Sequence, residues 1–242
     1  MTEIPLADGT RPRVFDRICE SLRVTGAVRL CNFDYPSFYD IVVRLGPVYR
    51  HPHSDSAGVT EIRPRTNTLH SVADEGFSSR SLELHTDRAQ MPSPPPILCA
   101  ICTIGPIAGG ESILMDFSSA IARLCKSGMT VDQLESALAI REYHTGKSLP
   151  MLWRDHGELG VRFREDRVAG PESADGALLA EIRATMASQV LEFGLLAGGG
   201  YIINNRRWLH GRRAFTGERL IRRVLITETS YEVADLDLEP RR

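Results

Sequence analysis

The chain has 242 residues, of which 42% are hydrophobic, and this supports one sizeable core in a single domain. Its 29 basic and 31 acidic residues give a net charge of −2 with no basic block, which argues against a nucleic-acid partner. No stretch resembles a secretory leader or reaches the ~18 apolar residues of a membrane span, so we expect a cytoplasmic protein without a membrane partner. The odd number of cysteines, five, indicates reduced thiols.

The first third of the chain is predicted to alternate helices with short strands. Val14, Ile18 and Leu22 recur at helical spacing, and Gly26 ends that helix. Asp34 is a candidate N-cap for a second helix. The predicted elements are helices over 13–23 and 34–45 and strands over 27–30, 59–63 and 81–85.

The middle of the chain contains a continuous apolar run over 97–104, which predicts a buried strand. Cys99 and Cys102 lie three residues apart in this run, so they would face opposite sides of the sheet. That placement excludes a shared zinc ion or a redox pair. The proline-rich stretch 92–96 cannot join a ladder and is interpreted as a rigid connector. A further strand is predicted over 111–116 and helices over 117–126 and 130–139.

The last third contains the longest predicted helix. Apolar residues recur at helical spacing from Leu178 to Phe193, and the glycines at 198–200 are expected to end this helix. Residues 141–170 have a mixed composition, and we interpret them as a lid insertion that closes over substrate. The predicted elements are a helix over 173–196 and strands over 162–164, 201–203 and 219–226.

Three side chains form the first candidate site. His85 and Asp87 are separated by one residue, and on an extended strand this spacing points both side chains to the same face. His210 lies far away in sequence, and a barrel or jelly roll would bring it to the other two. Two histidines and one carboxylate leave coordination positions open, as in non-haem Fe(II) oxygenases. A His-x-Asp sequence by itself also occurs in surface turns.

His51 and His53 form a rival pair. Their spacing would also allow a shared metal ion, with Glu61 as a third ligand of a cupin-like site. The residues around the pair are proline, serine, aspartate and glycine, which are typical of a loop. The sequence therefore favours a solvated loop here.

The last predicted strand contains three arginines. Arg219 and Arg223 are four residues apart and would share one face, whereas Arg222 would face the other side. A buried guanidinium is costly unless it is paired, and its planar donors match a carboxylate. The pattern therefore indicates a binding site for carboxylates, although a surface strand with ion pairs would look the same.

The ordered combination of these motifs resembles the taurine dioxygenase and clavaminate synthase superfamily of Fe(II)/2-oxoglutarate-dependent oxygenases. The matching positions run from about residue 80 to 228 and include Gly109-Gly110-Glu111-Ser112 and Asn205-Arg206-Arg207-Trp208-Leu209-His210-Gly211-Arg212. The second segment is more similar to the clavaminate synthase branch, which includes free amino-acid hydroxylases. The resemblance implies a mainly β fold with flanking helices, class α+β, on a double-stranded β-helix or jelly-roll core. The core would occupy about 80–242, with residues 1–79 packed on the outside of the barrel.

The resemblance also implies a role for each site residue. His85, Asp87 and His210 would hold Fe(II), while Ser112 and Arg219 would bind the distal carboxylate of 2-oxoglutarate. Arg223 would face the substrate or its carboxylate. The spacing from His210 to Arg219 is shorter than is usual in the clavaminate synthase branch, which leaves the choice among the three arginines open.

The implied reaction uses O2 as cosubstrate and hydroxylates an unactivated C–H bond, with 2-oxoglutarate converted to succinate and CO2. Asp87 favours this outcome, because a glycine or alanine there opens a chloride site in related halogenases. The same cofactors also support desaturation or ring formation. The expected substrate is a small carboxylate-bearing molecule, an amino acid or a derivative in specialised biosynthesis. A cupin-type enzyme and a non-catalytic binding protein of the same fold stay open as alternatives.

Overall fold

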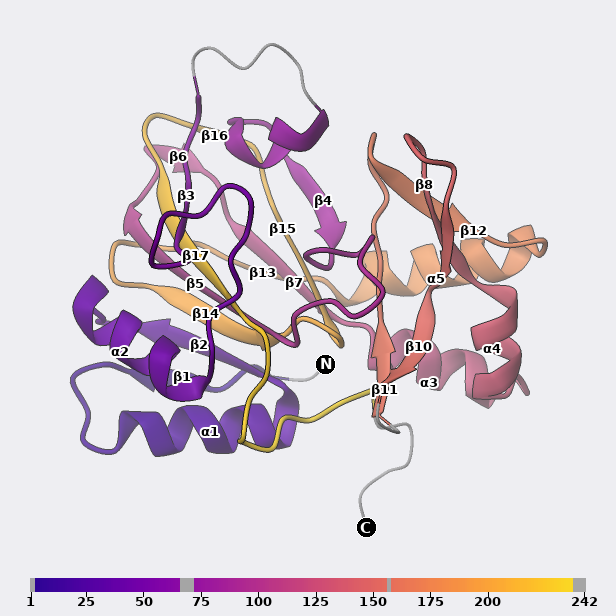
Figure 1. Ribbon diagram of the computed structural model, residues 1–242, viewed down its shortest axis with the longest axis horizontal. Coiled ribbons are helices and arrows are strands. Elements are labelled where there is room, and N and C mark those ends of the chain that lie inside the picture. The colour runs from indigo at the N-terminus through magenta and orange to yellow at the C-terminus, as the bar shows by residue number, and fades with distance from the viewer. Residues whose placement is uncertain (1–2, 66–71, 156–157, 237–242) are drawn as a thin grey trace.

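The computed structural model describes residues 3–65, 72–155 and 158–236, and two facing β-sheets form its centre (Figure 1). The larger sheet has the strand order β1 (Leu6–Asp8), β2 (Ala27–Cys31), β14 (Gly200–Asn204), β5 (Ile97–Ile104), β17 (Leu220–Ile226) and β3 (Thr60–Ile62). Early and late strands alternate in this order, so the two ends of the sequence meet in one sheet, as expected for a jelly roll.

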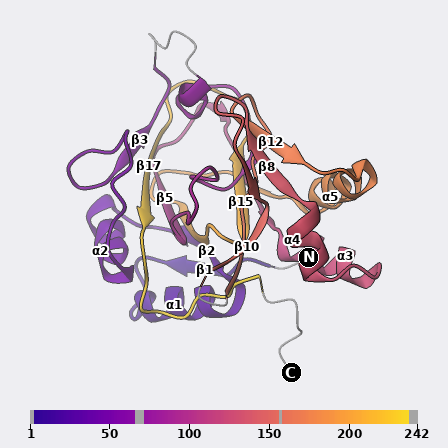
Figure 2. The ribbon, with the colours of Figure 1, turned by 45° about the vertical axis from the view of Figure 1, so that its right-hand side comes forward.

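The smaller sheet has the order β13 (Leu191–Phe193), β7 (Ser112–Asp116), β15 (Trp208–Arg212) and β4 (Leu82–His85). In the turned view, β15 and β17 lie on opposite sides of the interior (Figure 2). Apolar side chains meet between the sheets, including Leu98 and Ile203 from the larger sheet and Leu114 from the smaller one. The expected mainly β, α+β fold on a jelly-roll core is therefore confirmed.

Two N-terminal helices, α1 (Val14–Thr25) and α2 (Tyr35–Leu45), pack on the outer face of the larger sheet (Figure 1). Asp34 caps α2 as predicted, because its carboxylate accepts a hydrogen bond from the Ser37 amide at 2.7 Å. The strand between the helices, β2, does not lie outside the barrel as the resemblance implied. It is paired with β14 inside the sheet, where its apolar side chains are covered on both faces.

The cysteines of β5 face opposite sides of the larger sheet, as predicted. Cys99 belongs to the apolar cluster under α1 and α2, whereas Cys102 belongs to the cluster between the sheets. Both thiols are free, and burial raises the pKa of each. The Cys-x-x-Cys sequence is therefore part of the core.

A second layer of helices covers the outer face of the smaller sheet. It consists of α3 (Ser118–Lys126), α4 (Val131–Ala137) and α5 (Gly176–Gln189). The smaller elements are the 3-10 helix η1 (Val72–Phe77), the pair β6 (Ala108–Gly109) and β16 (Phe215–Thr216), the sheet of β12 (Ala169–Glu172), β8 (Ala139–Glu142) and β9 (Ser148–Pro150), and the hairpin of β10 (Leu152–Asp155) and β11 (Glu158–Val161). No helix in the described ranges is long and apolar enough to cross a membrane.

The helix predicted over 173–196 is shorter than expected. It ends at Gln189, and the next residues leave the helical conformation to form β13, which pairs with β7. Leu191 and Phe193 pack against the core cluster between the sheets from this strand. The apolar spacing therefore fits a strand as well as a helix, and sheet pairing decides between them. The glycines at 198–200 follow a strand and do not end a helix.

The predicted lid, 141–170, contains regular structure, since β8 to β12 fall within or next to it. The strand predicted over 162–164 is wrong, because β11 ends at Val161. The backbone of Phe163 instead forms two hydrogen bonds with Thr86: its carbonyl accepts from the Thr86 amide at 2.8 Å, and its amide donates to the Thr86 side-chain Oγ1 at 3.1 Å. This pair of bonds draws the segment toward β4 and away from a ladder.

Burial of α2 on the larger sheet leads to a stability prediction. Phe38 is fully buried, and Phe38→Ala is expected to lower the free energy of unfolding by about 3–5 kcal/mol through lost apolar burial and a cavity. Val43 lies on the same helix but is 47% exposed, so Val43→Ala should change it by less than about 1 kcal/mol. Urea denaturation of both variants measures the difference, and equal effects would contradict this placement of α2.

Candidate active site

The two histidines of the candidate site are direct cross-strand partners. His210 on β15 is paired with His85 on β4, and their ring centroids lie 4.3 Å apart. Both side chains are buried. The next residue, Gly211, is required here because a Cβ atom would lie 2.5 Å from the Leu82 carbonyl oxygen. Glycine therefore lets β15 approach β4 closely enough for the two imidazoles to share one face.

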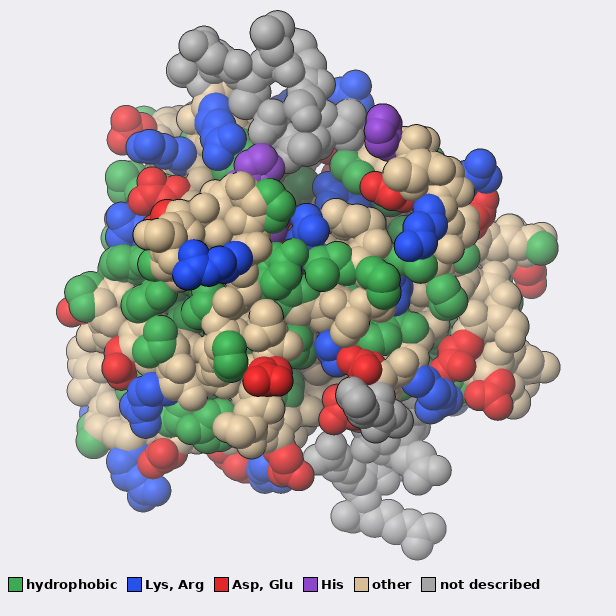
Figure 3. All heavy atoms as spheres, viewed as in Figure 1, with side chains coloured by type: hydrophobic (Ala, Val, Ile, Leu, Met, Phe, Trp, Pro, Cys, Tyr) green, Lys and Arg blue, Asp and Glu red, His purple; other side chains and the backbone are tan. Residues whose placement is uncertain are grey.

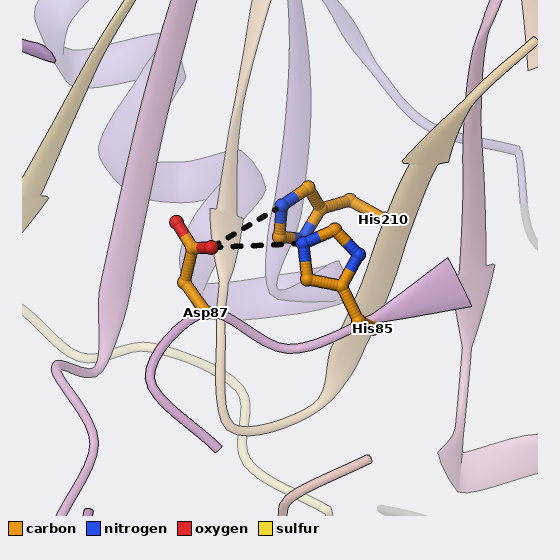
Figure 4. A group of neighbouring side chains, drawn as sticks. All are labelled: His85, Asp87 and His210. Atoms are coloured by element: carbon orange, nitrogen blue, oxygen red, sulfur yellow. Dashed lines mark ion pairs between the residues drawn. The ribbon is translucent and has the colours of Figure 1, made fainter. Parts of the chain in front are cut away.

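Asp87 lies in a turn just after β4 and not on the strand itself, which corrects the simple same-face argument. Its backbone is held by the side chain of Asn205, whose Oδ1 accepts from the Asp87 amide at 2.8 Å and whose Nδ2 donates to the Asp87 carbonyl at 3.0 Å. Asp87 Oδ1 lies 3.7 Å from His85 Nε2 and 3.8 Å from His210 Nε2 (Figure 4). The turn thus brings the carboxylate to both imidazoles.

The segment after Asp87 is held by hydrogen bonds from two arginines. Arg162 donates to the carbonyls of Ala89, Met91 and Pro92, and Arg206 donates to the carbonyl of Pro94. Both guanidinium groups lie over the ring of Trp153, at 5.1 Å and 4.9 Å from its centroid. Side chains from the predicted lid and from the 204–207 turn therefore fix the backbone that carries Asp87.

A cavity of about 210 Å³ adjoins the three side chains. Histidine and basic side chains gather near a hollow on the face shown in Figure 3. Ser112, Tyr201, Arg219 and Arg223 line the cavity from the two sheets or their edges, and His51, His53, Arg88, Gln90 and Arg164 line it from loops. The predicted site residues therefore all border one cavity.

Arg219 is buried and has no anionic partner among the described residues. The residue is 5% exposed, and its Nε has no hydrogen bond within the same ranges. Burial lowers the pKa of Arg219, because the low-dielectric surroundings disfavour its charge. A buried guanidinium in this state is costly, and an incoming carboxylate would relieve the cost.

The two arginines of β17, Arg222 and Arg223, face opposite sides of the sheet, as predicted. Arg222 pairs with Glu61 at 3.2 Å and lies over the ring of Tyr35, away from the cavity. Arg223 faces the cavity, and its Nη1 lies 3.0 Å from Oδ1 and 2.8 Å from Oδ2 of Asp87. Arg223 therefore neutralises Asp87, while its buried Nε has no partner in the described part of the chain.

A family model for taurine catabolism dioxygenases, the TauD and TfdA family, matches residues 3–225. The chain belongs to this family. The TauD/TfdA fold is also found in solved structures at low identity, and a search of curated proteins found no match.

Three of these structures illustrate the likeness. PvcB from Pseudomonas aeruginosa has a TM-score of 0.64 and 20% identity, over 90% of this chain and 81% of PvcB. An asparagine oxygenase solved with Fe(II), hydroxyasparagine and succinate has a TM-score of 0.61 and 17% identity, over 89% of this chain and 80% of that one. The iron oxygenase OrfP, solved with succinate and a dihydroxyarginine, has a TM-score of 0.66 and 16% identity, over 89% and 81%.

This TauD/TfdA member is an Fe(II)- and 2-oxoglutarate-dependent oxygenase, and its donor set fits the metal. His85 Nδ1 lies 2.8 Å from the Glu83 carbonyl, which places the proton on Nδ1 and leaves Nε2 as a ligand. Burial lowers the pKa of His210 to about 3, so its ring is neutral near pH 7. Burial would raise the pKa of Asp87, but Arg223 and the imidazoles hold it well below its usual value.

The rival metal site is not assembled. His51 and His53 border the cavity, but Glu61 forms an ion pair with Arg222 on the other face of the sheet. Within the described ranges, His85, Asp87 and His210 form the one group of three histidine, cysteine or acidic side chains whose ligand atoms all lie within 4.8 Å of one another. The geometry therefore favours this set over the cupin-like one.

Two residues of this site were not expected from the sequence. The sequence predicts Tyr201 only as the start of a strand. In the structure, Tyr201 on β14 pairs with Ala100 on β5, and Ala100 also pairs with Arg223 on β17, so the three form one row across the sheet that lines the cavity. Burial raises the pKa of Tyr201 to about 12. Asn205 was noted only as part of the motif. Tyr201 could have been predicted from the alternation of side chains along its strand, once that strand was placed in the same sheet as Arg223. The hydrogen bonds of Asn205 could not, because they depend on the conformation of a turn.

The bonds of Asn205 lead to a prediction about metal affinity. Asn205→Ala removes its hydrogen bonds to the Asp87 backbone and to the Pro95 carbonyl, and should weaken Fe(II) binding about 10- to 100-fold. Anaerobic Fe(II) titration of the folded protein measures this change. The matched control is Asn204→Ala, because Asn204 is also buried but bonds to the Ala234 carbonyl and the Arg206 amide. Equal affinity losses in both variants would contradict a specific role for Asn205.

Proposed function

We propose that this oxygenase hydroxylates an unactivated C–H bond of a small carboxylate-bearing substrate, an amino acid or a derivative, in specialised biosynthesis. The observation that carries the proposal is the presence, in one cavity, of a His–Asp–His ligand set and of a buried arginine that has no anionic partner among the described residues. When bound, Fe(II) and 2-oxoglutarate activate O2 for insertion of one oxygen atom into the C–H bond, with release of succinate and CO2.

The side chains of the chain have separate tasks in this reaction. His85, Asp87 and His210 would hold the iron and leave the remaining positions open to 2-oxoglutarate and O2. Arg219 would bind the distal carboxylate of 2-oxoglutarate through its unpartnered donors, together with the buried hydroxyl of Ser112. The pairing of Arg223 with Asp87 keeps the carboxylate ionised and limits its movement.

The substrate part of the proposal is supported by the cavity and by the neighbours. Arg223 retains a buried Nε without a partner, so the prediction that it faces a substrate carboxylate remains compatible with its bond to Asp87. The asparagine oxygenase and OrfP were solved with hydroxylated amino acids, and PvcB is described as part of an isonitrile synthetic pathway. These neighbours make amino acids the first compounds to test.

The role of Arg219 can be tested by binding alone. Arg219→Met should raise the Kd of 2-oxoglutarate about 10- to 100-fold, because charge-assisted hydrogen bonds to the distal carboxylate are lost. Anaerobic calorimetry with Fe(II) present measures the Kd. Arg222→Met is the matched control, since this arginine leaves the same strand toward Glu61, and it should bind 2-oxoglutarate as the wild type does. An unchanged Kd in Arg219→Met would mean that another positively charged residue binds the distal carboxylate of 2-oxoglutarate.

The reaction can be tested with a panel of L-amino acids and simple derivatives, scored by succinate release and product mass. At least one compound should stimulate Fe(II)-dependent succinate release and gain one oxygen atom. His210→Ala should lose this activity because it removes a proposed iron ligand. If the wild type binds 2-oxoglutarate but no compound of the panel is oxidised, the amino-acid class is wrong while the cofactor assignment stands.

A further inference from the structure

Most of the positive charge around the cavity already has a partner. Arg223 is paired with Asp87, and Arg164 is paired with Asp166 at 2.7 Å. Arg219 has no acidic partner among the described residues, but it lines the same cavity as Ser112, and the proposed function assigns both to the distal carboxylate of 2-oxoglutarate. Arg164 therefore needs no anion from a substrate, Arg219 is assigned to 2-oxoglutarate, and Arg223 has only its buried Nε left for a substrate among the described residues.

Arg212 also has its donors satisfied, although by backbone and not by an acid. Its guanidinium donates to the carbonyls of Gly76, Ser78 and Arg80 at 2.7–3.3 Å. Burial lowers its pKa to about 10, consistent with a structural cation that fastens the 76–80 segment to β15. Arg212 is therefore not available to a ligand.

Arg88 is different from the other arginines of the cavity. It follows Asp87 directly and has a φ of 60°, in the left-handed region that residues other than glycine rarely adopt. Its Nε donates to the sulfur of Met91 at 3.2 Å, and no carboxylate in the described ranges pairs with it. The backbone thus holds a cation without an anion at the cavity wall, beside the proposed iron site.

Gln90 lies two residues further along and also borders the cavity. Its Oε1 is buried and has no hydrogen-bond donor among the described residues. Leaving a buried acceptor without a donor is unfavourable, so this oxygen is suited to an N–H group of a ligand. The turn after β4 therefore presents to the cavity a cation and an acceptor that have, among the described residues, no carboxylate partner and no donor respectively.

His51 completes the polar wall of the cavity. Its Nδ1 accepts a hydrogen bond from the His53 amide at 3.1 Å. With Nδ1 as acceptor, the neutral ring carries its proton on Nε2, which makes this nitrogen a donor. The wall next to Arg88 therefore favours an anionic group over a cationic one.

We propose that Arg88 and Gln90 form the substrate-recognition subsite of this enzyme, with Arg88 binding a carboxylate and Gln90 Oε1 accepting a hydrogen bond from an N–H group. The inference rests on the proposed function, because it names the groups by which a substrate would be held beside the iron. The N–H group belongs either to the amine of a free amino acid or to the amide of an N-acylated one. Both carry the same two recognition elements, and the test separates them.

The experiment begins with the wild-type holoenzyme and the twenty proteinogenic L-amino acids with their N-acetyl derivatives. The compound that most stimulates succinate release identifies the source of the N–H group. Its KM, and its Kd by anaerobic calorimetry with Fe(II) and 2-oxoglutarate, are then measured in Arg88→Gln, Arg88→Lys and Gln90→Leu. Arg167→Gln is the control, because this arginine is exposed next to Val168 of the cavity wall.

Arg88→Gln should raise KM and Kd for the stimulating compound about 10- to 100-fold and leave the Kd of 2-oxoglutarate unchanged. Arg88→Lys should restore part of the loss because it keeps the charge. Gln90→Leu should weaken binding of the compound. It should not weaken binding of the nitrogen-free analogue, the carboxylic acid in which a hydrogen atom replaces the amino or acetylamino group. Arg167→Gln should match the wild type.

An Arg88→Gln enzyme with unchanged KM and Kd would overturn the subsite and leave the proposed function standing. A Gln90→Leu enzyme that weakens the compound and its nitrogen-free analogue equally would overturn the role of Gln90. If no compound stimulates the wild type, the amino-acid class and the subsite fall together, while binding of 2-oxoglutarate still reports on the cofactor site.

Discussion

The register between β15 and β4 is the constraint on which the site depends. It sets His210 directly opposite His85, and side chains alternate along a strand, so a slip of one residue would turn an imidazole to the outer face. Gly211 permits the close approach that this register requires. Asn205 then ties the turn after β4 to the turn before β15 through the Asp87 backbone. The ligand set is thus a product of sheet pairing.

Buried positive charge is the second constraint. Arg223 on β17 and Arg219 just before it extend from the larger sheet into the cavity, where Arg219 is buried and Arg223 is mostly buried. Asp87 neutralises Arg223, and a bound diacid would neutralise Arg219. Any ligand that binds only the folded chain stabilises it, so this arrangement links occupancy of the cavity to the stability of the whole jelly roll.

Much of this arrangement is visible in the sequence. The alternation of Arg219, Arg222 and Arg223 gave the correct faces, and the apolar run of β5 gave the correct burial of Cys99 and Cys102. The predicted helix was wrong at Leu191 and Phe193, because their apolar spacing fits both a helix and a strand. Pairing with β7 makes this segment a strand. Prediction from the sequence also failed where tertiary bonds replace a ladder, as at Phe163. The position of Arg88 depends on a left-handed turn that no local pattern specifies.

The stack of Arg162, Trp153 and Arg206 has a consequence for engineering. Trp153 belongs to the hairpin of β10 and β11, and the two guanidinium groups on its ring also hold the carbonyls between Ala89 and Pro94. Exchanging that hairpin for the equivalent piece of another oxygenase would therefore remove the ring that both guanidinium groups pack on, and so loosen their hold on the segment after Asp87. A chimaera made to alter selectivity needs the tryptophan and both arginines transplanted as one unit.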